Sequence, residues 1–328
     1  MERMKEELEK RKEKIDQEIA EIFEDKGDHS LWKSMSYYPE SGGKKLRPFL
    51  AMVSTAVFDE PEEKAIPYGV ALELVHNFTL VHDDLMDQDE MRRGNPTLHQ
   101  KIGDAHAINA GDGLFALAFN LLSKTKVEGE KIRELLDELS SSVIKIAEGQ
   151  EEDLSFEEDF DIKENDFIQM IEKKTAYLFR AATRGGAIIA GSDEEEIDKM
   201  GEYARKMGIA FQLQDDYLDL VGDEGKIGKD VGSDIKEGKR TLMVIKALSE
   251  LSGEDAERLM DILQKNDNPD PEIDEAIGLL EKAGAIEYSK ELAETYGEKA
   301  KNELEDLPDN ENKKILEELV DFVITRDR

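Results

Sequence analysis

The chain has 328 residues, and its 78 acidic and 44 basic side chains give a formal charge of −34. So acidic a protein would repel the phosphates of nucleic acid, which argues against a nucleic-acid-binding protein. Cysteine is absent, which excludes disulfides and cysteine nucleophiles and suits a reducing compartment. No uncharged apolar run reaches the roughly 18–20 residues of a membrane-spanning helix, and the N-terminus has no signal-peptide core. We therefore expect a cytoplasmic protein without a transmembrane segment.

The acidic excess also bears on the search for functional residues. A salt-rich cytosol would screen repulsion among surface carboxylates, so a halophilic origin is one explanation of the acidity and plain solubility is the other. If most acidic side chains are an adaptation of the surface to its solvent, the functional ones must be recognised by their spacing and neighbours.

Apolar residues recur at three- and four-residue spacing along almost the whole chain, and alternating strand patterns are missing. The charged, amphipathic segment 1–24 predicts a peripheral N-terminal helix, which packs either on the same domain or on a partner subunit. The segment 67–86 is so densely apolar that it predicts a helix buried on most sides. Further helices are predicted over 104–123, 131–149, 166–190 and 196–221, with several more in 253–328.

Breaks rich in Gly or Pro separate these helices, and they fall at 41–43, 61, 94–96, 191–192 and 222–238. No shift in composition and no Ser/Gly linker marks a domain boundary. We therefore predict an all-α fold in a single domain over 1–328, with central helices ringed by outer ones.

Two acidic motifs end strongly apolar helical segments. Asp83-Asp84-Leu85-Met86-Asp87 ends the first, and Asp215-Asp216-Tyr217-Leu218-Asp219 ends the second. In each motif the first and last Asp are four residues apart and share one helix face, whereas the second Asp lies about 100° round the helix. Carboxylates crowded on an apolar helix repel one another unless a cation holds them, and oxygen-only ligands favour magnesium. One such motif could arise by chance in this acidic chain, but two copies indicate a magnesium site.

Clustered bases are informative in so acidic a chain. They occur in GGKKLRP at 42–48, at Arg92-Arg93, at Lys173-Lys174 and in 226–240. Each cluster taken alone is typical of a surface salt bridge. Because magnesium usually completes its shell with substrate phosphates, and phosphates need Lys and Arg, the clusters together predict at least one phosphate site beside the metal site.

Eight ordered blocks resemble the trans-isoprenyl diphosphate synthases, the family that makes farnesyl and geranylgeranyl diphosphate. They cover most of the chain: GGKKLRP, ELVHNFTLVHDDLMD, RRGNPTLH, AGD at 110–112, GQEEDL, KTAYLF, FQLQDDYLD and GSDIKEGKRTL. The resemblance implies an all-α fold of the isoprenoid synthase type, whose central helices surround a deep cavity with two facing Asp-rich motifs. It also implies a homodimer and about three magnesium ions, with manganese able to substitute.

The resemblance assigns the acidic residues to metal and allylic diphosphate binding. Asp83 and Asp87 would ligate two magnesium ions, with Asp84 beside them. Asp215 would ligate the third ion, supported by Asp216 and Asp219. Further residues would hold the allylic diphosphate or line the reaction centre: Arg92, Lys174, Lys229 and Lys239 for the diphosphate, Thr175 and Gln212 for the centre.

A second, metal-free pocket would bind isopentenyl diphosphate through Lys44, Arg47, His76 and Arg93. Without the resemblance, we would interpret His76 as a core histidine. The implied reaction is the ionisation of an allylic diphosphate (dimethylallyl, geranyl or farnesyl), attack of the isopentenyl double bond on the cation, and loss of a proton. It requires no protein nucleophile.

Product length depends on the floor of the cavity. Phe78 lies five residues before Asp83, about 7.5 Å along the helix axis, and a ring there could close the pocket. Its neighbour Thr79 is small. In the family, one aromatic residue at this position with a small neighbour resembles the archaeal geranylgeranyl type, so a twenty-carbon product is expected. A farnesyl or bifunctional farnesyl/geranylgeranyl synthase remains open, as does an ordinary core role for Phe78.

Other functions remain to be weighed. A terpene cyclase or head-to-head synthase would have no reason to keep the isopentenyl pocket. A metal phosphohydrolase would need further His ligands, and a generic cation-binding protein would not explain the ordered bases. A non-catalytic regulatory subunit should have lost some metal-binding Asp, and here all six are present.

Overall fold

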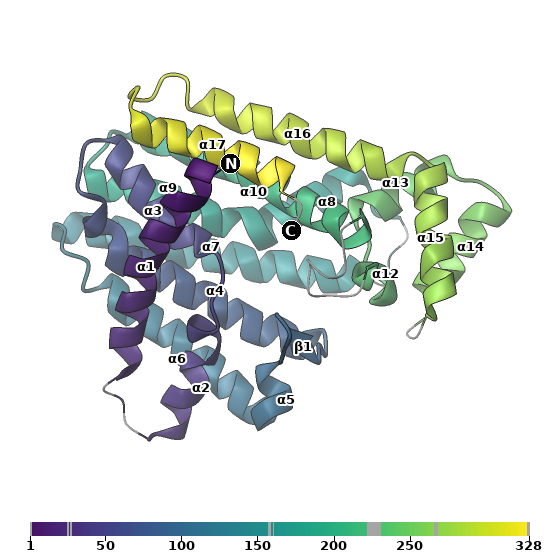
Figure 1. Ribbon diagram of the computed structural model, residues 1–328, viewed down its shortest axis with the longest axis horizontal. Coiled ribbons are helices and arrows are strands. Elements are labelled where there is room, and N and C mark those ends of the chain that lie inside the picture. Colours follow the sequence, from purple (N-terminus) through teal and green to yellow (C-terminus); the bar gives the residue numbers. More distant parts are fainter. Residues whose placement is uncertain are drawn as a thin grey trace. The chain divides into compact units, whose positions relative to one another are not determined.

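The computed structural model describes residues 2–24, 26, 28–156, 159, 161–221, 231–265 and 268–326. Over these residues the chain is helical apart from one two-stranded hairpin (Figure 1). The all-α class predicted from the apolar spacing is thus confirmed.

Internal contacts divide the chain into two compact units. Unit 1 comprises Met1–Val143, Leu178–Ala204 and Glu303–Leu319, and unit 2 comprises Ile144–Tyr177, Arg205–Asn302 and Val320–Arg328. The single domain expected from the composition stays a prediction, and each unit is described by itself below.

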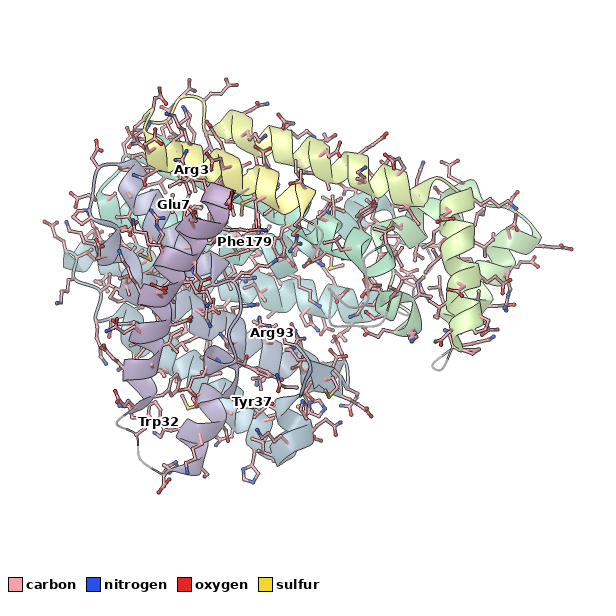
Figure 2. All side chains as sticks on the ribbon, in the orientation of Figure 1. Arg3, Glu7, Trp32, Tyr37, Arg93 and Phe179 are labelled. Atoms are coloured by element: carbon pink, nitrogen blue, oxygen red, sulfur yellow. The ribbon has the colours of Figure 1, made fainter. Side chains whose placement is uncertain are left out.

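Unit 1 begins with helices that pack on one another. Its elements are α1 (Glu2–Glu24), α2 (Ser30–Glu40), α3 (Leu46–Val57), the 3₁₀ turn Glu62–Ala65, α4 (Ile66–Met86), β1 (Met91–Arg92), β2 (Asn95–Pro96), α5 (Leu98–Ile102), α6 (Asp104–Leu122), the first half of α7 (Gly129–Phe156), α9 (Tyr177–Ala190) from Leu178 onward, α10 (Glu194–Val221) up to Ala204 and α17 (Glu311–Thr325) up to Leu319. Helix α1 packs on α2, α3 and α4 through an apolar stripe that includes Met4, Ile15 and Ile19. Arg3, labelled in Figure 2, lies near the start of α1 and pairs with Glu311 and Glu318 of α17.

Helix α4 is the centre of unit 1 and packs against both α3 and α6 (Figure 1). Pro67 lies in its first turn, where a missing N–H costs nothing. The residues from Val70 to Val75 are buried, including the charged Glu73. Close packing of α3 on α4 requires Gly69, because a Cβ there would lie 2.9 Å from the Pro48 Cα. The dense apolar segment therefore forms the buried helix that it predicts.

Unit 2 contains the second half of α7 and the helices that follow. Its elements are α8 (Glu164–Ile171), the π-helical turn Glu172–Ala176, α10 (Glu194–Val221) from Arg205 onward, α12 (Ser233–Lys236), α13 (Leu242–Glu250), α14 (Glu254–Leu263), α15 (Asp270–Lys282), α16 (Ala285–Glu303) up to Asn302, and the end of α17 (Glu311–Thr325). One apolar cluster joins α13, α14 and α15, and a second joins α8 to α10.

Two features differ from the sequence prediction. The segment 166–190 is predicted as one helix, but a π-helical turn separates α8 from α9. The break at 94–96 is part of a tight hairpin in which Met91 pairs with Pro96 and Arg92 with Asn95. Both features place charged residues of the predicted site.

Among the described residues, no helix combines the length and the apolar character needed to cross a lipid bilayer.

Candidate active site

The first acidic motif lies at the end of α4 in unit 1. The Asp87 N–H donates to the Asp83 carbonyl at 2.8 Å, so helical geometry continues through the motif. Asp83 and Asp87 are partly exposed, whereas Asp84 is 1% exposed. The motif therefore presents two carboxylates toward the surface of the unit and turns the third inward, as the helical spacing predicts.

Asp84 binds two residues from other elements. The Tyr38 hydroxyl of α2 donates to one carboxylate oxygen, and the Arg92 guanidinium of β1 donates to the other. The Leu98 N–H in turn donates to the Tyr38 oxygen at 3.0 Å. Burial and the hydrogen bond to Asp84 raise the pKa of Tyr38, so the hydroxyl stays protonated and donates. Asp84 thus fixes the position of Arg92.

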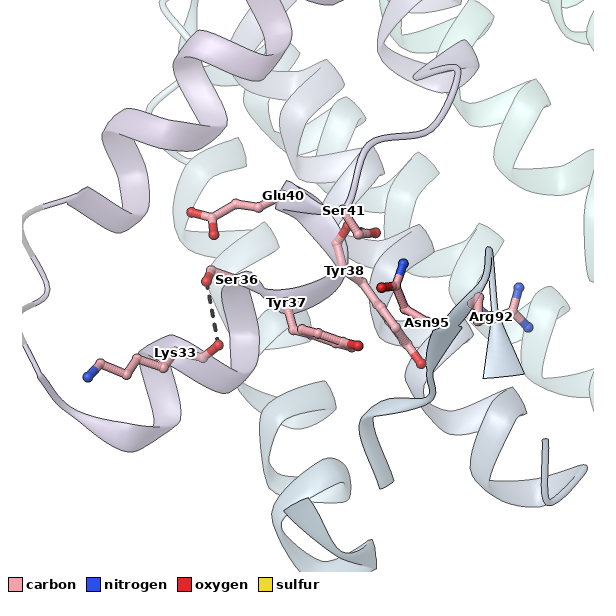
Figure 3. Close-up of a pocket in the computed structure, with 8 residues that line it drawn as sticks. All are labelled: Lys33, Ser36, Tyr37, Tyr38, Glu40, Ser41, Arg92 and Asn95. Atoms are coloured by element: carbon pink, nitrogen blue, oxygen red, sulfur yellow. Dashed lines mark hydrogen bonds between the residues drawn. The ribbon is translucent and has the colours of Figure 1, made fainter. Parts of the chain in front are cut away.

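Tyr38 and Arg92 also line a pocket of about 430 Å³ between α2 and the hairpin (Figure 3). The Tyr37 and Tyr38 rings extend from α2 toward the hairpin that carries Arg92 and Asn95 (Figure 3). The Tyr37 hydroxyl donates to the Pro96 carbonyl at 2.8 Å. These contacts hold the hairpin against α2.

His76 lies in the middle of α4, close enough to four bases for their charges to shift its pKa. Burial lowers the pKa of His76 well below its usual value, and the positive charges of Arg47, Arg93, Arg92 and Lys45 lower it further. The imidazole is therefore neutral at neutral pH and can donate one hydrogen bond. The structure thus brings together three of the four residues predicted to bind isopentenyl diphosphate, His76, Arg47 and Arg93.

Arg47 and Arg93, the two arginines predicted to bind isopentenyl diphosphate, are held by neighbouring groups. The Arg47 guanidinium lies 4.6 Å from the centre of the Phe179 ring, a cation–π distance. Arg93, labelled in Figure 2, donates from Nη1 to the Gly42 carbonyl at 3.1 Å. Gly43 has a φ of +109°, and a Cβ there would lie 2.9 Å from the Arg93 guanidinium. The Gly-Gly pair of the GGKKLRP block is needed for this turn and this approach.

The two lysines of that block differ in their environment. Lys44, the predicted ligand, is exposed. Lys45 is 3% exposed and donates from Nζ to the Pro39 carbonyl at 2.8 Å and to Glu73 at 3.3 Å. Lys45 is therefore part of the interior of unit 1, and Lys44 is the lysine that a ligand could reach.

The second acidic motif lies on α10 in unit 2. Thr175 donates to the Gln212 side chain at 2.8 Å, and Gln212 donates to Asp216 at 2.9 Å. Burial raises the pKa of Asp216 well above its usual value, and the charges of Asp234, Asp215 and Asp219 raise it further, against the Gln212 hydrogen bond. Three predicted site residues, Thr175, Gln212 and Asp216, thus form one hydrogen-bonded chain.

The two remaining acids of this motif have separate partners. Asp215 is exposed and pairs with Arg326, which also lies 4.1 Å above the Phe211 ring. Asp219 accepts from the Ser233 hydroxyl at 2.6 Å and from the Asp234 N–H at 3.2 Å. Asp219 therefore fixes the start of α12, and Asp215 is joined to the end of α17.

The predicted diphosphate ligand Lys174 lies in the π-helical turn. Close contact of α7 with this turn requires Gly149, because a Cβ there would lie 2.5 Å from the backbone nitrogen of Lys174. Lys174 pairs with Asp153 at 2.5 Å, and Lys173 pairs with Glu152. Single-turn π-bulges are frequent at functional sites. The acids of the GQEEDL block therefore pair with the two lysines and fix their side chains.

Lys239 pairs with Glu237 at 2.5 Å in unit 2. Lys229, predicted to bind the same diphosphate, lies outside the described residues.

The predicted chain-length residue Phe78 belongs to a row of aromatic rings in unit 1. Its ring centre lies 5.1 Å from that of Phe115 on α6, which is 4.9 Å from that of Phe119. His82 lies 4.7 Å from Phe78 and packs on Gly111, which explains why a Gly stands in the AGD block. Thr79 donates to the His76 carbonyl at 2.8 Å.

In the part of the chain that the structure describes, no three His, Asp or Glu side chains converge as a ready-made metal cage. The carboxylate pair Asp83 and Asp87, four residues apart and partly exposed, fits a magnesium ion that takes one or two protein carboxylates and completes its shell with substrate oxygens and water.

Sequence reasoning did not identify four residues that position the predicted substrate-binding side chains, namely Tyr38, Lys45, Glu73 and Asp153. Glu73 could have been found, because a charged residue inside a fully apolar helical run must have a partner. Tyr38 and Asp153 carry no such local signal.

The sequence model of the polyprenyl synthetase family matches residues 28–280. The chain belongs to the polyprenyl synthetase family. The short chain isoprenyl diphosphate synthase of Methanothermobacter thermautotrophicus is 42% identical over 320 residues, 98% of each chain. The crystal structure of geranylgeranyl pyrophosphate synthetase from Pyrococcus horikoshii superimposes with a TM-score of 0.92 at 39% identity, covering 98% of this chain and 99% of that one.

A third relative differs in its product. The geranylfarnesyl diphosphate synthase of Natronomonas pharaonis is 34% identical over 332 residues, 96% of each chain. The family resemblance inferred from the eight blocks is confirmed, and so is the enzyme class: the chain is a prenyltransferase of the short-chain isoprenyl diphosphate synthase type.

Proposed function

We propose that this enzyme condenses isopentenyl diphosphate with the allylic diphosphates dimethylallyl, geranyl and farnesyl diphosphate, and that its main product is geranylgeranyl diphosphate. The observation that carries the proposal is the cluster of Arg47 from α3, neutral His76 from α4 and Arg93 from the hairpin turn. Such a cluster suits a diphosphate that is bound without metal.

Asp83 and Asp87 are proposed to hold two magnesium ions, and Asp215 a third. Bound magnesium would supply neutralisation of the leaving diphosphate. Manganese, a hard cation of similar preference for oxygen, is expected to substitute.

This chain's own residues perform the remaining tasks. Arg92, fixed by Asp84, and Lys174, paired with Asp153, are proposed to hold the allylic diphosphate, together with Lys239 and Lys229. Their positive charge stabilises the negative charge that grows on the leaving group as the allylic carbon–oxygen bond breaks. The isopentenyl double bond then forms the new carbon–carbon bond, and a proton leaves the adjacent carbon.

The hydroxyl of Thr175 and the amide of Gln212 are proposed to face the allylic cation as oriented dipoles. Their mutual hydrogen bond and the one from Gln212 to Asp216 fix both groups before substrate binds. Water must be excluded from the cation, and the apolar helices that carry these residues serve that need.

The twenty-carbon product is supported by the position of Phe78. Its ring lies about 7.5 Å along α4 before Asp83, and Phe115 supports it from α6. A prenyl chain that grows away from the acidic motif along α4 would meet these rings. A homodimer, implied by the family resemblance, and a cytoplasmic location, expected from the composition, complete the proposal.

The test of the function uses purified protein, magnesium, isopentenyl diphosphate and dimethylallyl diphosphate. Condensation is expected for the wild type, and Asp83→Ala or Asp215→Ala is expected to lower turnover by orders of magnitude with the fold intact. Full activity with either change would contradict the metal assignment. Absence of condensation by the wild type would favour a non-catalytic regulatory subunit.

A further inference from the structure

Glu73 is a negatively charged residue beside the bases that are proposed to bind a diphosphate, which is itself negatively charged. It lies on α4, three residues before His76 and four before Asn77, so all three share one face of the helix. Its exposure is 4%, and a buried carboxylate is costly unless it is paired. By charge alone, it should weaken the binding of an anion among the neighbouring arginines.

The contacts of Glu73 lead to the turn that carries those arginines. Its carboxylate accepts from the Lys45 ammonium and from the Asn77 amide, each at 3.3 Å. Lys45, whose side chain is fully buried, also donates to the Pro39 carbonyl at the end of α2. The ammonium thus joins α4 to both ends of the 39–45 segment.

The 39–45 segment has a strained backbone, which the contacts of the Lys45 ammonium stabilise. Lys45 itself has a φ of 50°, and Gly42 and Gly43 have φ values of +94° and +109°. A residue other than Gly in the left-handed region costs free energy and persists only where its surroundings fix it. Arg47 follows two residues later, and the Gly42 carbonyl accepts from Arg93.

Glu73 also acts on Arg93 through its charge. Burial lowers the pKa of the Arg93 guanidinium, and the negative charge of Glu73 is the foremost influence that opposes this effect. The carboxylate therefore compensates part of the cost of burying the second arginine of the cluster.

We propose that Glu73 and Lys45 form a positioning pair for the isopentenyl diphosphate subsite: Glu73 holds Lys45, Lys45 holds the 39–45 turn, and the turn places Arg47 and Arg93. This proposal rests on the function proposed above. Neither residue contacts the substrate.

The direction in which Glu73→Gln changes the affinity for isopentenyl diphosphate distinguishes this positioning role from a simple effect of charge. Glu73→Gln keeps the shape of the side chain and an oxygen for Lys45, but it removes the charge. If Glu73 acted only by repelling the substrate, the variant would bind isopentenyl diphosphate more tightly. Positioning predicts the opposite, because the buried Lys45 ammonium loses the charge of the carboxylate that pairs with it and the turn relaxes.

The experiment measures steady-state kinetics with each substrate varied in turn. Glu73→Gln is expected to raise the KM for isopentenyl diphosphate about tenfold or more and to change the KM for the allylic diphosphate less than about twofold. Lys45→Met is expected to do the same. The double variant should be no worse than the worse single one, because both residues act as one unit. An unchanged or lowered KM for isopentenyl diphosphate in Glu73→Gln would overturn the proposal.

Glu138→Gln is the matched control for loss of stability. Glu138 is another largely buried acid of unit 1 and pairs with Arg180 and Arg184 on α9. The Glu138→Gln variant should lower the melting temperature as Glu73→Gln does, and it should leave the KM values for both substrates unchanged. An equal rise in the isopentenyl KM in this control would assign the effect to general destabilisation and overturn the proposal.

A second measurement keeps this test separate from the proposed function. Binding of inorganic pyrophosphate to the magnesium-free protein is followed by calorimetry, which needs no turnover. If the wild type makes no product, the proposed function fails, and weaker pyrophosphate binding by Glu73→Gln still supports the positioning pair. Equal binding by wild type and variant contradicts it.

Discussion

Asp84 is expected to contribute to stability as well as to activity, unlike its neighbour Asp83. Asp84 is 1% exposed and accepts hydrogen bonds from both Tyr38 and Arg92, whereas Asp83 is partly exposed. Asp84→Asn keeps the size of the side chain but leaves the Arg92 guanidinium without this carboxylate. It also offers one oxygen where two donors now bind.

The magnitude follows from the burial of the pair. Removal of one partner from a buried ion pair costs roughly 3–5 kcal/mol. The Arg92 side chain is 23% exposed, so water can replace part of the lost interaction. We therefore expect Asp84→Asn to lower the free energy of unfolding by about 3 kcal/mol, the lower end of this range.

The assay is urea unfolding of the magnesium-free protein, followed by circular dichroism. Asp83→Asn serves as the matched control, with an expected change of less than about 1 kcal/mol because the side chain is partly exposed. Both variants should lose activity. Wild-type stability of Asp84→Asn, or equal destabilisation by Asp83→Asn, would refute the interpretation of Asp84 as the residue that positions Arg92.

Three further predictions concern the same unit and the charge of the chain. Phe78→Ala should lengthen the product, and Phe78→Ala with Phe115→Ala should lengthen it further, as measured by chromatography of the dephosphorylated products; an unchanged distribution would place the floor elsewhere. Burial and the neighbouring arginines lower the pKa of His76, so below about pH 6.5 the unfolded chain binds more protons than the folded one and stability falls with the pH. His76→Gln should therefore flatten the fall in unfolding free energy between about pH 7 and 5, and an unchanged slope would contradict a neutral His76. Because the Debye length shrinks from about 10 Å at 0.1 M salt to about 3 Å at 1 M, potassium chloride should raise the melting temperature of this chain of charge −34, and no rise would leave solubility as the reason for its acidity.

The sequence predicts those parts of the site that depend on helical periodicity. The density of apolar residues in 67–86 requires a buried helix, and α4 spans Ile66–Met86. Once that helix is given, the four-residue spacing puts Asp83 and Asp87 on one face and turns Asp84 away. These inferences use only the local chain.

The parts that the sequence did not predict depend on contacts between distant segments. The π-helical turn at 172–176 lies against Gly149, and a contact over that distance along the chain has no periodic signature. For the same reason the two lysines of GGKKLRP could not be told apart. Lys45 is the buried one because Glu73 and Pro39 approach it from other elements.

The central claim is tested most directly by the length of the product. Purified enzyme, magnesium and isopentenyl diphosphate are mixed with dimethylallyl, geranyl or farnesyl diphosphate at low and high potassium chloride, and the dephosphorylated products are separated by chain length. A dominant twenty-carbon alcohol from each starter is the predicted result. A dominant fifteen- or twenty-five-carbon alcohol would contradict the floor at Phe78, and no condensation at any salt concentration would contradict the proposed function itself.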